Sequence, residues 1–298
     1  MQVVAGKSSK VQTSVLSKVR SYAVFAKMRL TSLVVISAVA GYFIGMDQFS
    51  LKHLLALIVG GLLVTASSNG FNQIIEKDLD ALMNRTKNRP LPTGQMSVRE
   101  GLIVAGTSGI IGIFLLWNLI HPLCGILGAL SLFVYVAMYT PLKRVSSIAV
   151  FVGAFPGAIP PLLGYVAARG TFDLEGGVLY AIQFIWQFPH FWAIAWKSND
   201  DYQKAGFKLL PSRGGKNGMS AFQIFFYTLI LIPVSVLPVV FGFVSLNGAI
   251  GILIIGLLFL VPATKLVLKK DDKSATQLMY WSFIYLPVIL LLILIFKQ

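Results

Sequence analysis

The sequence predicts an all-α polytopic membrane protein with nine transmembrane helices, on the strength of three observations. First, 56% of the 298 residues are hydrophobic and only 12% are charged, a composition that soluble domains do not have. Second, apolar segments recur that are about 20 residues long, the length a helix needs to cross a bilayer. Third, lysine and arginine gather in alternate loops, as membrane topology requires.

The nine apolar segments are separated by polar loops or by short breaks such as His121-Pro122. Glycine and proline are frequent inside them, for example in AFPGAIPPLLG. Helix bundles in membranes tolerate this because neighbouring helices satisfy the freed backbone groups. The expected spans are residues 28–46, 52–75, 99–120, 122–141, 146–168, 176–197, 218–243, 247–267 and 276–296.

The distribution of basic residues predicts which loops face the cytoplasm. With the N-terminus inside, the inner segments hold 22 of the 25 lysines and arginines, and only Lys52, Arg169 and Lys297 fall outside. Cytoplasmic loops carry such an excess, so the count supports nine spans with a cytoplasmic N-terminus. It also accounts for the net charge of +14 without nucleic acid as a partner; the expected surroundings are the lipid bilayer.

The chain is expected to consist of a flexible cytoplasmic segment, residues 1–27, and one membrane domain, residues 28–298. Residues 1–20 are basic and serine-containing but lack the apolar centre of a signal peptide, and a short organellar transit segment is the alternative. The single cysteine, Cys124, cannot form an internal disulfide and belongs to no metal-binding pattern. We expect it to be a buried structural residue.

A ladder of polar side chains ends the second span. Asn72, Glu76 and Asp80 are spaced by four, which places them on one face of a helix that runs from the membrane edge into a loop. Carboxylates at this spacing repel one another unless a cation lies between them, and such oxygen ligands suit Mg²⁺. Arg85 and Arg89 follow, and arginine binds phosphate oxygens in bidentate fashion. The pattern predicts a diphosphate site; the alternative is an exposed, ion-paired helix end.

Two further loops on the same predicted side carry charged residues. Positive charge alone would serve topology, so carboxylates at these positions need another explanation. Three loops that converge on one interface predict a site for phosphate and metal. At spacings of four these loops contribute Tyr139 and Lys143, Lys197 and Asp201, and Asp200 and Lys204.

Motifs along nearly the whole chain resemble the UbiA-type intramembrane prenyltransferases. The segment NQIIEKDLDALMNRTKNRPLPTG resembles the first signature of that superfamily, with Gln73 and Glu76 where other branches carry aspartate. Both changes are similar to the haem O synthase branch, the protohaem IX farnesyltransferases. So are DDYQKAGFKLLP, KMRLTSL, YTPLKR, GAIPPLLGY and WQFPHFWAIAW.

The resemblance implies a helical bundle around a central cavity that is capped on the cytoplasmic side. It implies farnesyl diphosphate and haem B as substrates, Mg²⁺ as cofactor, and addition of the farnesyl group and then water at the 2-vinyl group to give haem O. The implied location is the bacterial inner membrane, with the mitochondrial inner membrane as the alternative. Hand-over of the product to haem A synthase or to terminal oxidase assembly is also expected.

The resemblance also implies roles for the residues of the three loops. Glu76, Asp80 and Asp201 would hold Mg²⁺, with Asp200 as an alternative ligand, and Asn72 would bind a phosphate oxygen or a metal-bound water. These contacts would strengthen as charge develops on the leaving diphosphate. The remaining members of the anion site would be Arg85, Arg89, Tyr139, Lys143, Lys197 and Lys204.

The sixth span would bind the acceptor. His190 precedes Asp201 by eleven residues, about 16 Å along a helix, and would contact the porphyrin or its iron. The alternative is a histidine hydrogen-bonded between helices. Arg29, Lys27 and Arg144 are candidates for the haem propionates. Aromatic residues near His190 would shield the allylic cation, unless they are core or lipid-facing: Phe184, Trp186, Phe188, Phe191 and Trp192.

Two other functions compete with this interpretation. A related prenyltransferase could use a quinone precursor or another aromatic acceptor, although Glu76 and His190 favour haem. A transporter of anionic solutes would also need charged residues, but it would carry them near the bilayer midplane, whereas here they gather at one interface.

Overall fold

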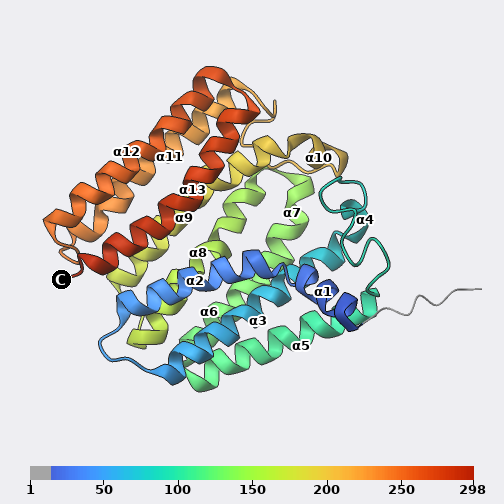
Figure 1. Cartoon of the computed structure of the whole chain (residues 1–298), viewed down its shortest axis with the longest axis horizontal. Helices are drawn as coiled ribbons and strands as arrows, with labels where there is room; N and C mark the ends of the chain where they lie inside the picture. Colours follow the sequence, from blue (N-terminus) through green and yellow to red (C-terminus); the bar gives the residue numbers. More distant parts are fainter. Residues whose placement is uncertain (1–14) are drawn as a thin grey trace, which may run out of the picture.

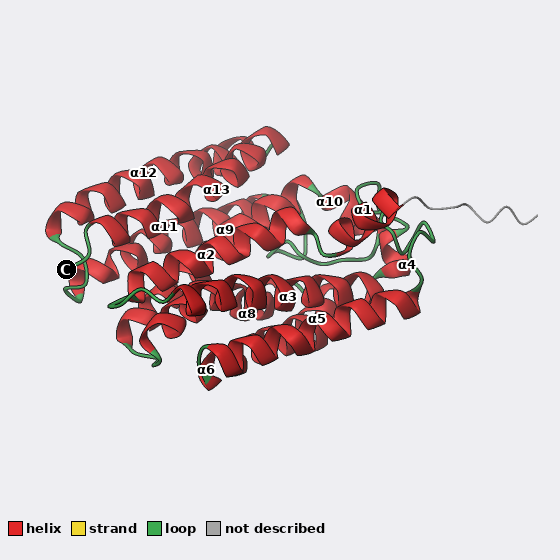
Figure 2. Ribbon diagram, turned by 60° about the horizontal axis from the view of Figure 1, so that its bottom comes forward, coloured by secondary structure: helices red, strands yellow, loops and turns green. Residues whose placement is uncertain are grey.

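A computed structural model describes residues 15–298 and shows a bundle of long helices (Figures 1 and 2). Within this range the only β-type pairing is an isolated bridge between Val244 and Lys297. The first half of the chain forms α1 (Val15–Phe25), α2 (Met28–Gly45), α3 (Leu51–Ile75), α4 (Lys77–Asp80), α5 (Val98–Leu119), α6 (Pro122–Phe133), the π-helical segment η1 (Val134–Tyr139) and α7 (Thr140–Val145). The second half forms α8 (Ile148–Arg169), α9 (Leu174–Lys197), α10 (Asn199–Lys204), α11 (Gly218–Val240), α12 (Leu246–Lys269) and α13 (Asp272–Ile295).

Eight helices of the described chain are long and apolar enough to cross a membrane, which confirms a polytopic all-α protein. The fourth of these is one continuous stretch, Pro122–Val145, made of α6, η1 and α7. Helix α9 has 24 residues but falls outside this set. Gln183, Gln187 and His190 lie within it and lower its hydropathy. The count of nine spans therefore stays a prediction.

The polar residues of α9 have structural partners in the proline-containing helix α8. Pro161 has no N–H, so the carbonyl of Gly157 loses its helical partner. The side chain of Gln183 donates to this carbonyl at 2.7 Å, while its oxygen accepts from Ser37 of α2. Gln187 likewise donates to the carbonyl of Ala154 at 2.9 Å. These bonds join three helices, and the bond from Gln183 satisfies a freed backbone carbonyl that membrane lipid could not.

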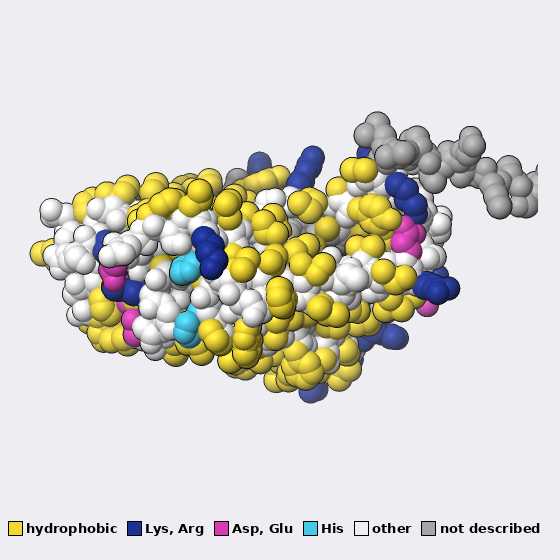
Figure 3. Space-filling view, turned by 90° about the horizontal axis from the view of Figure 1, so that it is seen from below, with side chains coloured by type: hydrophobic (Ala, Val, Ile, Leu, Met, Phe, Trp, Pro, Cys, Tyr) yellow, Lys and Arg dark blue, Asp and Glu magenta, His cyan; other side chains and the backbone are white. Residues whose placement is uncertain are grey.

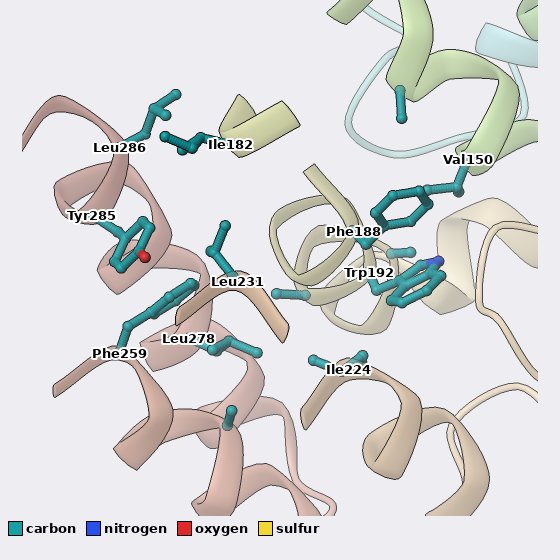
Figure 4. Packing of buried hydrophobic residues seen from close by; sticks show 14 of the residues in the cluster. Val150, Ile182, Phe188, Trp192, Ile224, Leu231, Phe259, Leu278, Tyr285 and Leu286 are labelled. Atoms are coloured by element: carbon teal, nitrogen blue, oxygen red, sulfur yellow. The ribbon is translucent and has the colours of Figure 1, made fainter. Parts of the chain in front are cut away.

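The largest apolar core lies among α8, α9, α11, α12 and α13. Figure 4 shows Phe188 and Trp192 side by side on α9, with Ile224 of α11 beneath them. On the outside, hydrophobic side chains cover much of the face in Figure 3, while acidic side chains lie toward its two ends and basic side chains also appear between them. This distribution is that of a protein whose middle section faces lipid.

The short elements that follow the polar motifs gather at one end of the bundle. Figure 1 shows α1, α4, α7 and α10 on the same side of the molecule, opposite the C-terminus. Within the predicted N-terminal segment 1–27, residues Val15–Phe25 form a helix, and residues 1–14 lie outside the described range. Cys124 is buried and forms no disulfide, as expected of a structural residue.

Candidate active site

A cavity of about 540 Å³ runs from the polar end into the bundle. Its outer part is lined by charged and polar side chains from α3, α4, the loop after α4, and α7. Its inner part is lined mainly by apolar side chains and glycine from α2, α3, α8, α9 and α13, such as Val35, Pro160 and Phe283. Such a cavity suits a ligand with an anionic head and a long apolar tail.

The predicted ladder lines the outer part of this cavity. Asn72, Glu76 and Asp80 are all buried, with exposed fractions of 1%, 4% and 0%. The expected continuous helix is wrong, because α3 ends at Ile75 and α4 begins at Lys77. The spacing survives the break, since the amide of Glu76 donates to the carbonyl of Asn72 and that of Asp80 to Glu76. The three side chains therefore still share one face.

Each buried carboxylate has a basic partner, which offsets the repulsion within the ladder. Asp80 accepts from Arg89 at 2.6 Å, and Glu76 pairs with Lys143 of α7 at 2.5 Å. The second oxygen of Asp80, Oδ1, is buried without a hydrogen-bond partner. Burial raises the pKa of the Asp80 carboxyl, and Arg89 opposes this effect. A buried oxygen without a partner is costly, so this oxygen is available to bind a ligand.

Lys27 is a further basic residue at the polar end of the cavity, whereas the sequence pointed to it only as a candidate for the haem propionates. It lies between α1 and α2 in the left-handed conformation, with φ of 48°, which is uncommon for a residue other than glycine. Its Nζ donates to Oδ1 of Asn72 at 3.4 Å, and it lines the cavity. Burial lowers the pKa of Lys27 to about 7, and the nearby cations Arg89 and Lys143 act in the same direction. Lys27 is the first residue of the motif KMRLTSL.

The other residues around Asn72 hold the ladder in place. Asn72 donates from Nδ2 to Thr140 of α7 at 3.2 Å. Gln73 is turned away from the cavity lining, and its amide donates to the carbonyl of Phe25 at 2.6 Å. The side-chain amide of Gln73 therefore bonds the C-terminal end of α1 to α3. This bond is a structural reason for an amide side chain at position 73.

The second acidic loop meets the first, as predicted, but its carboxylates do not line the cavity. Asp201 accepts from the backbone amides of Asn84 and Arg85 at 3.2 and 3.1 Å. Lys204 also donates to Asp201 at 3.0 Å, and this bond is the main reason why the pKa of Asp201 is lowered. In this structure Asp201 thus holds the backbone of the first loop.

Asp200 and the remaining lysines of this loop lie further out. The side chain of Asp200 is 87% exposed and is 3.9 Å from Lys216. Lys197 and Lys204 are exposed and are not among the residues that line the cavity.

The third loop connects the other two. The amide of Lys208 donates to the carbonyl of Lys143 at 2.7 Å, so the loop after α10 is bonded to α7. Nζ of Lys143 lies 4.9 Å from the ring centre of Tyr139, and the guanidinium of Arg85 lies 4.6 Å from that of Tyr202. All four side chains line the cavity. Aromatic faces favour cations at such distances, so the rings fix the basic groups in position.

The inner part of the cavity contains His190, as predicted from its depth on the sixth span. The path from His190 to Asp201 is not one helix, because α9 ends at Lys197 and α10 begins at Asn199. Of the five aromatic residues proposed to shield a cation, Phe191 lines the cavity and the other four do not. Phe184, for example, stacks with Tyr180 at 6.0 Å between ring centres.

Neither arginine proposed for the propionates lines the cavity. Arg29 and Arg144 are exposed, near the ends of α2 and α7. Tyr135 and Tyr202 also line the cavity, and neither is among the residues predicted for the site.

The residues present fit Mg²⁺ that is shared with a substrate phosphate. In residues 15–298 no three histidine, cysteine or acidic side chains are close enough to hold a metal alone. Mg²⁺ instead favours one or two carboxylates together with phosphate oxygens and water. Glu76 and Asp80 offer two such carboxylates, and Oδ1 of Asp80 is free to bind.

Comparison with known proteins identifies the family and the fold of this chain. The UbiA prenyltransferase family model matches residues 34–286. The chain belongs to this family. It is 48% identical over 271 residues to the "Protoheme IX farnesyltransferase" of Flavobacterium psychrophilum, covering 88% of this chain and 89% of the relative. It is 44% identical to the protein of the same name from Cytophaga hutchinsonii, covering 92% and 96%.

Solved structures of more distant proteins share the fold. A digeranylgeranylglyceryl phosphate synthase aligns with a TM-score of 0.78 at 19% identity, over 94% of this chain and 98% of the other. A UbiA homologue from Archaeoglobus fulgidus, bound to DMAPP and Mg²⁺, aligns with a TM-score of 0.73 at 14% identity, over 92% and 99%. At these identities the likeness concerns the fold alone.

Proposed function

We propose that this protein transfers the farnesyl group of farnesyl diphosphate to the 2-vinyl group of haem B, where water then adds, so that the products are haem O and diphosphate. The observation that carries this proposal is the buried face of Asn72, Glu76 and Asp80 at the head of an otherwise apolar cavity that contains His190. The names of relatives at 44–48% identity over about 90% of the chain support haem as the acceptor.

The diphosphate would bind at the polar end. Lys27, Arg85, Arg89 and Lys143 all line this region and would contact its oxygens, and Tyr139 would act as a neutral donor. Glu76 and Asp80 would hold Mg²⁺, which neutralises charge on the leaving group when bound. Because the cationic side chains are held by ring faces and ion pairs, they are already oriented toward the charge that develops as the allylic C–O bond breaks.

Asp201 would act differently from the ladder. By accepting from the amides of Asn84 and Arg85, it would hold the loop that presents Arg85. We propose this positioning role for Asp201. Lys204 would support it through the ion pair with Asp201, and Asp200 would help to hold the second loop through its ion pair with Lys216. Lys197 would guide the anionic substrate toward the site through its charge.

The isoprenoid chain would occupy the apolar part of the cavity. Its wall excludes water until the vinyl carbon attacks the allylic cation. Phe191 lies in this wall and can stabilise positive charge through its ring. His190 would face the porphyrin, while Arg29 and Arg144 would meet propionates near the cytoplasmic surface.

We propose nine spans with the N-terminus and the three loops on the cytoplasmic side of the bacterial inner membrane. The positive-charge distribution supports this orientation.

The decisive experiment is to incubate purified protein with Mg²⁺, radiolabelled farnesyl diphosphate and haem B, and to separate the pigments by hydrophobicity. We expect a labelled haem with the mass of haem O. Labelling of a quinone precursor but not of haem would favour a different acceptor. Passage of an anionic solute into proteoliposomes without release of diphosphate would favour a transporter.

A further inference from the structure

The imidazole of His190 is held rigidly at the inner end of the cavity. Its ring stacks on Trp186 of the same helix, with 4.4 Å between ring centres and 16° between planes. Phe283 of α13 contacts it edge-to-face at 4.9 Å. Its exposed fraction is 6%, so the ring cannot turn freely within its surroundings.

The hydrogen bonds of Ser282 determine which ring nitrogen carries the proton. Oγ of Ser282 lies 2.6 Å from the carbonyl of Met279, and a carbonyl can only accept. The single hydroxyl proton of Ser282 therefore goes to Met279. Nδ1 of His190 lies 2.7 Å from the same Oγ, so Nδ1 must be the donor in that bond. A neutral His190 consequently carries its proton on Nδ1 and leaves Nε2 with a free lone pair.

Trp186 fixes this arrangement from a second direction. Its indole Nε1 donates to the backbone carbonyl of Ser282 at 2.9 Å, while its ring face supports His190. The imidazole and the hydroxyl that orients it are thus both tied to the same tryptophan.

Nε2 has no hydrogen-bond partner in the part of the chain that the structure describes, although His190 lines the cavity. A histidine whose one nitrogen donates to a neighbouring group, and whose other nitrogen carries a free lone pair, has the arrangement of a metal ligand. The surrounding aromatic rings offer no alternative acceptor or donor. The ligand expected at Nε2 is therefore a metal ion inside a large flat apolar molecule.

We propose that Ser282 is a positioning residue that holds His190 as an Nε2 ligand for the iron of the acceptor. This inference rests on the proposed function, because only a metalloporphyrin supplies iron at this depth. Under this proposal Ser282 of α13 becomes part of the site. The acceptor end of the cavity would then select for the iron of the acceptor as well as for its porphyrin ring.

If Ser282 had only a structural role, its replacement would affect the binding of porphyrins in a different way. The bond between His190 and Ser282 also joins α9 to α13, so its loss could loosen the cavity for any ligand. Protoporphyrin IX without metal separates the two roles, because it has the same ring, vinyl groups and propionates but no iron. A loosened cavity would bind both porphyrins less well, whereas a lost ligand affects haem alone.

The test measures equilibrium binding of haem B and of metal-free protoporphyrin IX to purified full-length protein without farnesyl diphosphate. We expect His190→Ala to weaken haem binding on the order of 100-fold and Ser282→Ala to weaken it about 10-fold, as loss of a partner that orients a metal ligand does. Binding of protoporphyrin IX should stay within about twofold of wild type. Ser282→Thr, which keeps the hydroxyl, should restore haem binding, and free imidazole should restore the haem spectrum of His190→Ala.

Three results would overturn the proposal. The first is an equal loss of affinity for both porphyrins in the variants, and the second is no loss for either porphyrin. The third needs no variant: a ferrous haem complex of the wild type whose resonance Raman spectrum lacks an iron–histidine stretch. The proposed function is tested separately by farnesyl transfer, so a wild type that prenylates haem without ligating it through His190 would refute only this inference.

Discussion

The two acidic stretches of this protein look alike in sequence but do different things in the structure. Each follows the end of a long helix, and each contains acids and bases at spacings of four. Asp80 is fully buried and lines the cavity, whereas Asp200 has 87% of its side chain exposed and Asp201 is bonded to the first loop. The tertiary packing around a carboxylate near the membrane surface therefore decides whether that carboxylate can take part in a ligand site.

Electrostatics show the same contrast. Burial raises the pKa of Asp80 because the ionised form loses water, and Arg89 only partly compensates. Asp201 has a lowered pKa because Lys204 and two backbone amides stabilise its charge. A bound cation would therefore stabilise the ionised form of Asp80. The ionised form of Asp201 is already stabilised by Lys204 and the two amides.

The sharpest test of this contrast is Asp80→Asn, which keeps the size of the side chain and removes its charge. We expect turnover to fall about 10²- to 10³-fold, as for loss of one preorganised electrostatic contact in a transition state. Farnesyl transfer to haem B at saturating Mg²⁺ measures the loss. Asp78→Asn is the matched control, because Asp78 lies on the same short helix and is exposed. If both variants lost turnover equally, the burial of Asp80 would not explain its importance for the reaction.

Much of this site follows from spacing alone. The positions of Asn72, Glu76 and Asp80 required only that the backbone keep a four-residue repeat, and a helix break at Glu76 did not disturb it. The apolar spans were likewise predictable, because the bilayer sets both their length and their composition.

Other features depend on tertiary contacts that spacing does not encode. Asp200 and Asp201 are neighbours, yet one is bonded to a distant loop and the other faces water, a difference set by how α10 packs. Ser282 is an ordinary serine in an apolar run, and only the fold places it against His190. Gln183 and Gln187 lower the hydropathy of α9, but both donate to backbone carbonyls of α8, and Gln183 does so where Pro161 leaves a carbonyl without its helical partner.

A second test concerns the smaller role of Asp201. Asp201→Asn should reduce turnover by about tenfold, since it weakens hydrogen bonds to a charged acceptor without removing a group from the cavity. It should also raise hydrogen exchange at the amides of Asn84 and Arg85, which Asp201 now accepts from. Unchanged exchange together with a loss as large as that of Asp80→Asn would assign Asp201 to the metal directly and remove the contrast.

The smallest expected effect concerns Lys27, at the edge of the buried ladder. Burial lowers its pKa to about 7, so in the free protein it is charged at pH 6 and largely neutral at pH 9. A neutral amine binds diphosphate less well, and KM for farnesyl diphosphate should therefore rise roughly threefold to tenfold between pH 6 and pH 9.

The pKa of Lys27 also affects the stability of the fold. The unfolded chain holds this proton up to about pH 10.5, so the free energy of unfolding should increase as pH rises from 7 toward 10.5.

Lys27→Arg separates this effect from the ionisation of the substrate. Arginine stays charged throughout the range, so the variant should show a flatter dependence of KM on pH, while the substrate titrates identically in both proteins. If wild type and variant gave parallel profiles, Lys27 would carry a constant charge. The carboxylates of Glu76 and Asp80 would then outweigh the burial of Lys27, and the polar end of the cavity would be better solvated than its packing indicates.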